Sequence, residues 1–172
     1  MQKTGALKVT TPGDREIVMM RAFDAPRNLV WDALTKPELV KRWLLGPPGW
    51  SMPVCEIDLR VGGAYRYVWR RDGDGTEMGM GGVFREVAAP ERLVVTESFD
   101  EAWYPGQALV TNALVERDGR TTLTLTIRYE SREARDAVVA SDCVQGVGES
   151  YDKLAQLLES MQARGGSPAP SR

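Results

Sequence analysis

The sequence of 172 residues contains no histidine. This absence excludes Ser-His-Asp and Cys-His catalysis, and it removes the side chain that most often binds zinc or iron in proteins. Acid–base chemistry would have to use Asp, Glu, Lys, Tyr or Cys. Several carboxylates fall on predicted strands, namely Glu56, Asp58, Glu77 and Glu97. No pair among them can be assigned as acid and base, so we predict no catalytic residue, no metal site and no cofactor.

Cysteine is scarce, with only Cys55 and Cys143, far apart in the chain. They form no Cys-x-x-Cys pair or other spacing typical of metal ligands. A structural disulfide is not expected in a reducing compartment. The sequence therefore predicts that both cysteines are small buried side chains.

An excess of positive charge is also missing, because 24 acidic residues outnumber 22 basic ones and the net charge is −2. We expect no nucleic-acid partner, since binding a phosphate backbone requires positive charge. No apolar run approaches the roughly 20 residues of a membrane span. The N-terminal segment lacks the apolar core of a signal peptide. These absences predict a cytoplasmic protein without a membrane partner.

The residues that are present describe one globular domain. Hydrophobic residues make up 42% and charged residues 27% of the chain, which is an ordinary balance. A chain of this length can bury a core without disulfides. We predict a flexible tail over residues 1–13, a single domain over residues 14–163 and a disordered tail rich in Gly, Pro and Ser over residues 164–172.

The spacing of apolar residues predicts one strand, two short helices, six strands and one long helix, in that order. Residues 15–23 are apolar over the length of a strand, and residues 26–44 repeat apolar positions every three or four residues. From Pro53 to Tyr129 the period is two, in segments separated by turns. Ser131 is the predicted N-cap of the final helix. The result is an α+β fold in which a curled antiparallel sheet is covered by the final helix.

This order resembles the helix-grip fold of the SRPBCC superfamily, which includes START lipid-transfer domains and the birch-pollen allergen. Within it, the chain resembles the branch named for the activator of the ninety-kilodalton heat-shock protein ATPase. The matching segments cover about residues 15–161 and read "FDAPRNLVWDALTKPELVKRW", "DLRVGGAYRY", "GGVFREVAAPERLVVTESF", "TTLTLTIRYESREARDAV" and "GVGESYDKLAQLLE". The resemblance implies a sheet wrapped around the long C-terminal helix with a cavity between them. It does not define one function, because the family includes ligand binders, cyclases and co-chaperones.

Three tryptophans lie in the segment from Val30 to Trp50. By the resemblance, Trp43 points from the second short helix toward the cavity. Trp50 follows a stiff Gly-Pro-Pro-Gly turn and is expected at the mouth. Trp31 faces away from Val30 on the first helix, and we expect it to be partly exposed.

Three further rings, Tyr65, Tyr67 and Trp69, alternate on one face of a predicted strand. They are interpreted either as a pocket wall or as ordinary core packing. Buried Tyr and Trp need partners for their polar tips, so three in a row suit a partly hydrated cavity better than a dry core.

Met78 and Met80 alternate with Gly79 and Gly81 on the next strand. Methionine adapts to variable apolar ligands and glycine leaves room, but a gap-filling core or a glycine-rich bulge is an equal alternative.

Two glycines, Gly146 and Gly148, lie in the final helix, where alanine would be more stable. They leave room for a ligand, or they allow close helix–strand packing or a kink. The loop at residues 100–106 is interpreted as a lid or as a plain hairpin. The predicted cavity residues are Trp43, Trp50, Tyr65, Tyr67, Trp69, Met78, Met80, Phe84, Phe99, Trp103, Val110, Val147 and Tyr151.

The predicted function is binding of a hydrophobic small molecule, apolar or aromatic, in this cavity. The alternative, supported by family analogy, is an enzyme of the cyclase or dehydratase type acting on a polyketide-like or aromatic substrate. We do not expect a chaperone partner, because the resemblance implies a second domain in members with that role. A homodimer is compatible with exposed edge strands and surface aromatics.

Overall fold

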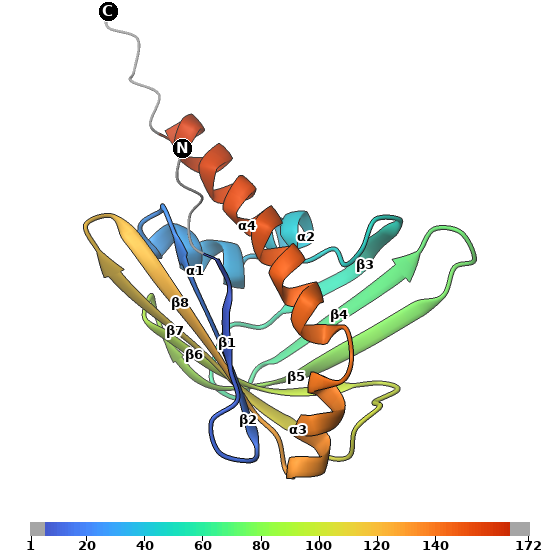
Figure 1. The fold of residues 1–172 in the computed structure, drawn as a ribbon. Helices are drawn as coiled ribbons and strands as arrows, with labels where there is room; N and C mark the ends of the chain where they lie inside the picture. Colours follow the sequence, from blue (N-terminus) through green and yellow to red (C-terminus); the bar gives the residue numbers. More distant parts are fainter. Residues whose placement is uncertain (1–5, 166–172) are drawn as a thin grey trace, which may run out of the picture.

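Eight antiparallel strands form one curled sheet in the computed structural model, which describes residues 6–165. The strands follow the order β1-β2-β8-β7-β6-β5-β4-β3, so β3 to β8 each pair with their neighbours in sequence. Their bounds are β1 (Lys8–Thr10), β2 (Glu16–Phe23), β3 (Trp50–Ile57), β4 (Ala64–Arg71), β5 (Glu77–Ala88), β6 (Arg92–Phe99), β7 (Ala108–Arg117) and β8 (Arg120–Arg128). Helix α4 (Cys143–Gly165) crosses the concave face of the sheet (Figure 1), which confirms the predicted α+β helix-grip fold.

The six predicted strands that follow the short helices all form. Strand β4 has the predicted bounds, while β3 begins at Trp50, before the alternating pattern that starts at Pro53. The register of β3 against β4 shifts between Ser51 and Val54, and this irregularity hides the start of the strand from a search for period two. Strand β3 lies at an edge of the sheet, where proline is tolerated because its missing N–H faces no neighbouring strand.

Strand β1 corrects one prediction. It falls inside the segment of residues 1–13 for which the sequence predicts a flexible tail, and that prediction is wrong for Lys8–Thr10. The strand forms because Val9 pairs with Met19 on β2. Such backbone pairing at a sheet edge needs no alternating pattern in the added strand. At the other end, Arg164 and Gly165 belong to α4, and the rest of the predicted C-terminal tail lies outside the described residues.

Two short helices, α1 (Arg27–Thr35) and α2 (Pro37–Trp43), close one end of the sheet as expected. Pro37 occupies the first turn of α2, where its missing N–H costs no hydrogen bond. Trp31, expected to be partly exposed, is only 6% exposed. The reason is that α1 packs against β7, β8, α2 and α4, so more than one of its faces is covered.

The predicted single C-terminal helix is two helices. Helix α3 (Arg132–Val139) starts as expected, with the Ser131 hydroxyl accepting a hydrogen bond from the Ala134 N–H at 3.0 Å. After a break, Ser141 Oγ accepts from the Cys143 N–H at 3.2 Å and so provides a partner for the first N–H of α4. Within α4, the predicted stripe is buried at Tyr151, Leu154 and Leu158. None of the helices in residues 6–165 is long and apolar enough to cross a membrane.

Candidate ligand-binding pocket

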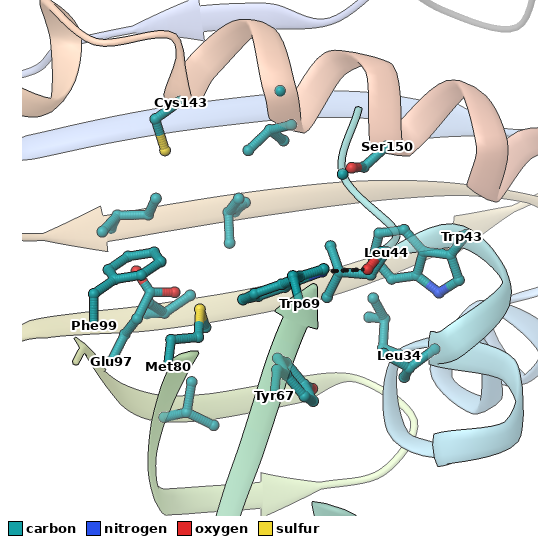
Figure 2. Close-up of a pocket in the computed structure, with 18 of the residues that line it drawn as sticks. Leu34, Trp43, Leu44, Tyr67, Trp69, Met80, Glu97, Phe99, Cys143 and Ser150 are labelled. Atoms are coloured by element: carbon teal, nitrogen blue, oxygen red, sulfur yellow. Dashed lines mark hydrogen bonds between the residues drawn. The ribbon is translucent and has the colours of Figure 1, made fainter. Parts of the chain in front are cut away.

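A pocket of about 490 Å³ lies between the concave face of the sheet and α4. Its lining comes from α1, α2, the turn that follows α2, strands β3 to β8 and the first half of α4, and it is mainly apolar and aromatic. The exposed residues of the lining, which mark where it reaches the protein surface, are Pro47, Met78, Asp142 and Gly146. Figure 2 shows the lining from inside, with Cys143 and Ser150 on α4 facing the side chains of the sheet.

The predicted cavity residues, with one exception, lie together in this lining. Those present are Trp43, Trp50, Tyr65, Tyr67, Trp69, Met78, Met80, Phe84, Phe99, Val110, Val147 and Tyr151. The exception is Trp103, which is 43% exposed and packs its ring against Phe99 and Tyr104, with centroids 5.0 and 5.2 Å away. Trp103 follows the end of β6, where strand alternation no longer directs side chains inward.

Tyr65, Tyr67 and Trp69 form a continuous row of rings along β4. The ring centroids are 5.1 Å apart between Tyr65 and Tyr67, and 6.0 Å apart between Tyr67 and Trp69. The Tyr65 hydroxyl donates to the Thr96 carbonyl at 2.8 Å. Trp69 Nε1 donates to the Leu44 carbonyl, also at 2.8 Å (Figure 2). Those two polar tips are therefore occupied by the protein itself.

The hydroxyl of Tyr67 differs, because it has no hydrogen-bond partner among residues 6–165. Burial raises the pKa of this phenol, so the group stays protonated at neutral pH and can donate. Of the three rings on β4, Tyr67 is the one that can offer its polar tip to a ligand.

A hydrogen bond and several ring contacts connect the elements at the end of the pocket beside the short helices. Trp43 Nε1 donates to the Ala33 carbonyl at 2.8 Å, which joins α2 to α1. The Trp43 ring lies 6.1 Å from that of Tyr151 on α4, and Tyr151 meets Phe23 of β2 edge to face at 5.7 Å. Trp50 is half-buried, with the Arg71 guanidinium 5.6 Å from its ring centroid. These contacts join residues of three helices and three strands around one end of the pocket.

Glu97 on β6 is the functional candidate that the sequence analysis did not assign. Its side chain lies in the pocket beside Phe99 and Met80 (Figure 2). Burial raises the pKa of this carboxyl from 4.5 to about 7. A signal was available, because Val95 and Phe99 face the pocket and period two along β6 puts Glu97 on the same side.

A few other polar groups interrupt the apolar lining. They are Asn112 on β7, Cys143 and Ser150 on α4, and Asp142 just before α4. Burial raises the pKa of the Cys143 thiol to about 11, so it is a neutral thiol near pH 7. Cys55 is partly buried and lies outside the lining, and burial raises its pKa to about 11 as well. Among residues 6–165, no three Cys, Asp or Glu side chains gather in a group that could hold a metal ion.

The glycines of β5 do not serve to make room for a ligand. A Cβ on Gly79 would collide with the ion pair between Arg66 and Asp100, and a Cβ on Gly81 would lie 2.6 Å from the Tyr65 carbonyl oxygen. Close approach of the β4 backbone therefore requires glycine at position 81, whereas at position 79 the Arg66–Asp100 ion pair occupies the space beside the glycine. Gly146 on α4 is different, because a Cβ there would meet nothing within 4 Å. Close helix–strand packing is therefore not the reason for a glycine at position 146.

The curled sheet, the long helix across it and the pocket between them define a helix-grip protein of the SRPBCC superfamily. Residues 24–159 match the model of the family described as Activator of Hsp90 ATPase homolog 1-like protein. The chain belongs to this family.

Solved structures of bacterial proteins are similar to this chain over most of its length. A protein of Rhodobacter sphaeroides shares 32% identity and a TM-score of 0.84, over 90% of this chain and 98% of that one. One of Chromobacterium violaceum shares 30% identity and a TM-score of 0.74, over 84% and 97%. One of Nitrosomonas europaea shares 28% identity and a TM-score of 0.75, over 88% and 99%. A comparison with curated proteins finds no match.

Proposed function

We propose that this protein binds an apolar or aromatic small molecule in the pocket between α4 and the sheet. The observation that carries the proposal is an apolar pocket of about 490 Å³ in which the Tyr67 hydroxyl and the Glu97 carboxyl have no partner within residues 6–165. Pockets for small molecules in proteins are typically about 300–1,000 Å³, apolar, with a few placed polar groups. The family to which the chain belongs is compatible with ligand binding.

The row of rings on β4 supports an aromatic or flat ligand. The tips of Tyr65 and Trp69 are hydrogen-bonded to backbone carbonyls, so these rings are held in place before any ligand arrives. A preformed wall lowers the entropy that binding must overcome. Ring faces that are fixed in this way favour stacking with a planar apolar group.

The proposal is tested with Nile red, an uncharged dye whose fluorescence rises in apolar sites, and with two variants of equal size. Val147→Phe adds a ring to the pocket lining, whereas Val139→Phe adds the same ring to an exposed position on α3. We expect saturable binding by the native chain, at least about tenfold weaker binding by Val147→Phe, and no change with Val139→Phe. Absence of saturable binding, or equal binding by all three proteins, would contradict the proposal.

The natural ligand is sought by native mass spectrometry of the freshly purified protein, followed by denaturation and analysis of released compounds. A stoichiometric adduct that Val147→Phe lacks and Val139→Phe retains would identify the chemistry of the ligand. Equal adducts on both variants would place the compound outside the pocket.

A second candidate function is an enzyme acting on a polyketide-like or aromatic substrate, and Glu97 is the observation that favours it. A carboxyl with a pKa of about 7 inside a pocket can donate or accept a proton at neutral pH. If the protein is such an enzyme, Glu97→Gln should abolish turnover of an aromatic polyketone while Nile red still binds. No turnover by the native chain across a panel of such substrates would leave binding as the function.

The cytoplasmic location and the homodimer also remain predictions. Fractionation of the native cells checks the first, and light scattering of the purified chain checks the second.

A further inference from the structure

The charged side chains of the pocket lining all carry the same sign. They are Glu97, inside the pocket, and Asp142, which is exposed at its edge. No Lys or Arg of residues 6–165 belongs to the lining. Lys153 contacts a residue of the lining, because its ammonium donates to the Gly46 carbonyl at 2.9 Å, but Lys153 itself is not part of the lining. The ionisable carboxyl groups of the pocket lining therefore have no positive partner within that lining.

Glu97 is the interior member of this pair. On β6 it lies between Val95 and Phe99, which face the same pocket. No hydrogen bond or ion pair within residues 6–165 reaches its carboxylate. An ionised carboxylate in apolar surroundings is costly unless an opposite charge or hydrogen-bond donors compensate it. A cation that enters the pocket would supply the missing compensation.

The aromatic rings of the pocket also favour a cationic ligand. Tyr65, Tyr67 and Trp69 form one wall, and Phe99 lies beside Glu97 (Figure 2). Aromatic faces attract cations through their quadrupole, and they attract them more strongly where water is excluded. A carboxylate ligand would gain neither interaction, and it would be repelled by Glu97.

We propose that the pocket selects apolar or aromatic molecules that carry a protonated amine, which pairs with Glu97, and that it discriminates against carboxylates. This inference rests on the proposed ligand-binding function and names the chemical class of the ligand. An uncharged molecule of the same shape fills the pocket but leaves Glu97 without a partner, so it binds more weakly.

The test compares three probes of nearly equal shape by isothermal titration calorimetry: naphthylmethylamine, naphthylmethanol and naphthoate. We expect the amine to bind about ten- to a hundredfold more tightly than the alcohol, because a hydrogen bond between charged groups contributes that much. Naphthoate should bind more weakly than the alcohol. Glu97→Gln should bring the amine to the affinity of the alcohol, whereas Glu56→Gln, an exposed carboxylate on β3 outside the lining, should leave the preference unchanged.

A pH series on the native chain provides a measurement that needs no variant. The preference for amine over alcohol should grow between about pH 5 and about pH 8, as Glu97 becomes ionised. Equal affinities of amine and alcohol, tighter binding of naphthoate, or an amine preference that survives in folded Glu97→Gln would overturn this inference and leave ligand binding standing. If none of the three probes binds a native chain that does bind Nile red, this inference fails and ligand binding stands; if Nile red does not bind either, the proposed function fails together with it.

Discussion

Trp69 Nε1 donates a hydrogen bond to the Leu44 carbonyl at 2.8 Å, and this contact joins β4 to the end of α2. Leu44 is the C-cap of α2, so its carbonyl has no partner within the helix. The indole therefore does two things at once: it forms part of the pocket wall and it satisfies a helix end. In this way the short helices, which would be unstable alone, are held to the strand that carries the aromatic row.

The first prediction concerns this hydrogen bond. Trp69→Phe keeps an aromatic ring on the wall but leaves the Leu44 carbonyl without its donor. We expect the free energy of unfolding in urea to fall by about 1–3 kcal/mol, from the lost hydrogen bond and the smaller ring. Trp103→Phe is the matched control, because Trp103 is largely exposed and has no such bond within residues 6–165, and it should change stability much less. Equal losses in the two variants would contradict the role assigned to Trp69.

The second prediction concerns the pH dependence of stability. Burial raises the pKa of Glu97 in the folded chain to about 7, against an ordinary value of 4.5. Between these pH values the folded chain holds a proton that the unfolded chain has released, so this carboxyl makes stability fall as pH rises through the window. The titratable groups that interact with it electrostatically stay neutral there, since burial raises their pKa values too; they are Tyr65, Tyr67, Tyr104, Tyr129 and Cys143.

Glu97→Gln removes this titration. The variant should match the native chain near pH 4 and should exceed its stability by up to about 3 kcal/mol above pH 7, as the shift in pKa requires. Urea unfolding at several pH values measures the difference. Glu56→Gln should show no such trend, and a stability difference for Glu97→Gln that is constant with pH would contradict the burial of this carboxyl.

The third prediction uses the two glycines of α4. A Cβ on Gly146 would meet nothing within 4 Å, and one on Gly148 would make an ordinary contact of 3.5 Å with Leu7. Both are in helical conformation, so Gly146→Ala and Gly148→Ala should each stabilise the chain, by about 0.5–1 kcal/mol. Thermal and urea unfolding check this result. A loss of stability at either position would show that the helix requires glycine for a reason other than space.

The fourth prediction concerns cysteine reactivity. Burial raises the pKa of Cys55 and of Cys143 to about 11, so both should react slowly with iodoacetamide at neutral pH. Only Cys143 lines the pocket. A bound ligand should therefore slow alkylation of Cys143 further and leave Cys55 unchanged, as peptide mass spectrometry would measure. Equal protection of both thiols would point to a general change in stability instead.

Much of the fold could be predicted because the apolar pattern of most segments agrees with the helix or strand that each segment forms. The alternation of Tyr65, Tyr67 and Trp69 placed these rings on one face of β4, and the structure has them there. The break between α3 and α4 was missed, although Ser141 is a good N-cap residue, because the apolar stripe continues on both sides of it. Strand β1 was missed because edge pairing with β2 leaves no periodic signal over three residues.

The sequence predicted the candidate site only in part. The sequence shows Glu97 on a strand but identifies no acid–base pair among the carboxylates, and period two alone does not reveal that a pocket lies on the side of β6 that carries Glu97. The pocket between α4 and the sheet, which Glu97 lines, forms only when these elements pack together. The local pattern also could not tell that Trp103 turns away from the pocket onto Phe99 and Tyr104.

The sequence by itself determined which face of each strand and helix is apolar, and with that the order and type of almost every element. Only the tertiary structure decided which residues pack against each face and which polar groups find a partner. It engages the polar tips of Tyr65 and Trp69 with backbone carbonyls, and it places Tyr67 and Glu97 in the pocket lining without a hydrogen-bond partner among residues 6–165. The physical reason is that the alternation of side chains along a strand is a local property, which the sequence of that strand reveals. Burial, pKa and hydrogen bonding depend on segments that are distant in sequence and adjacent only after folding.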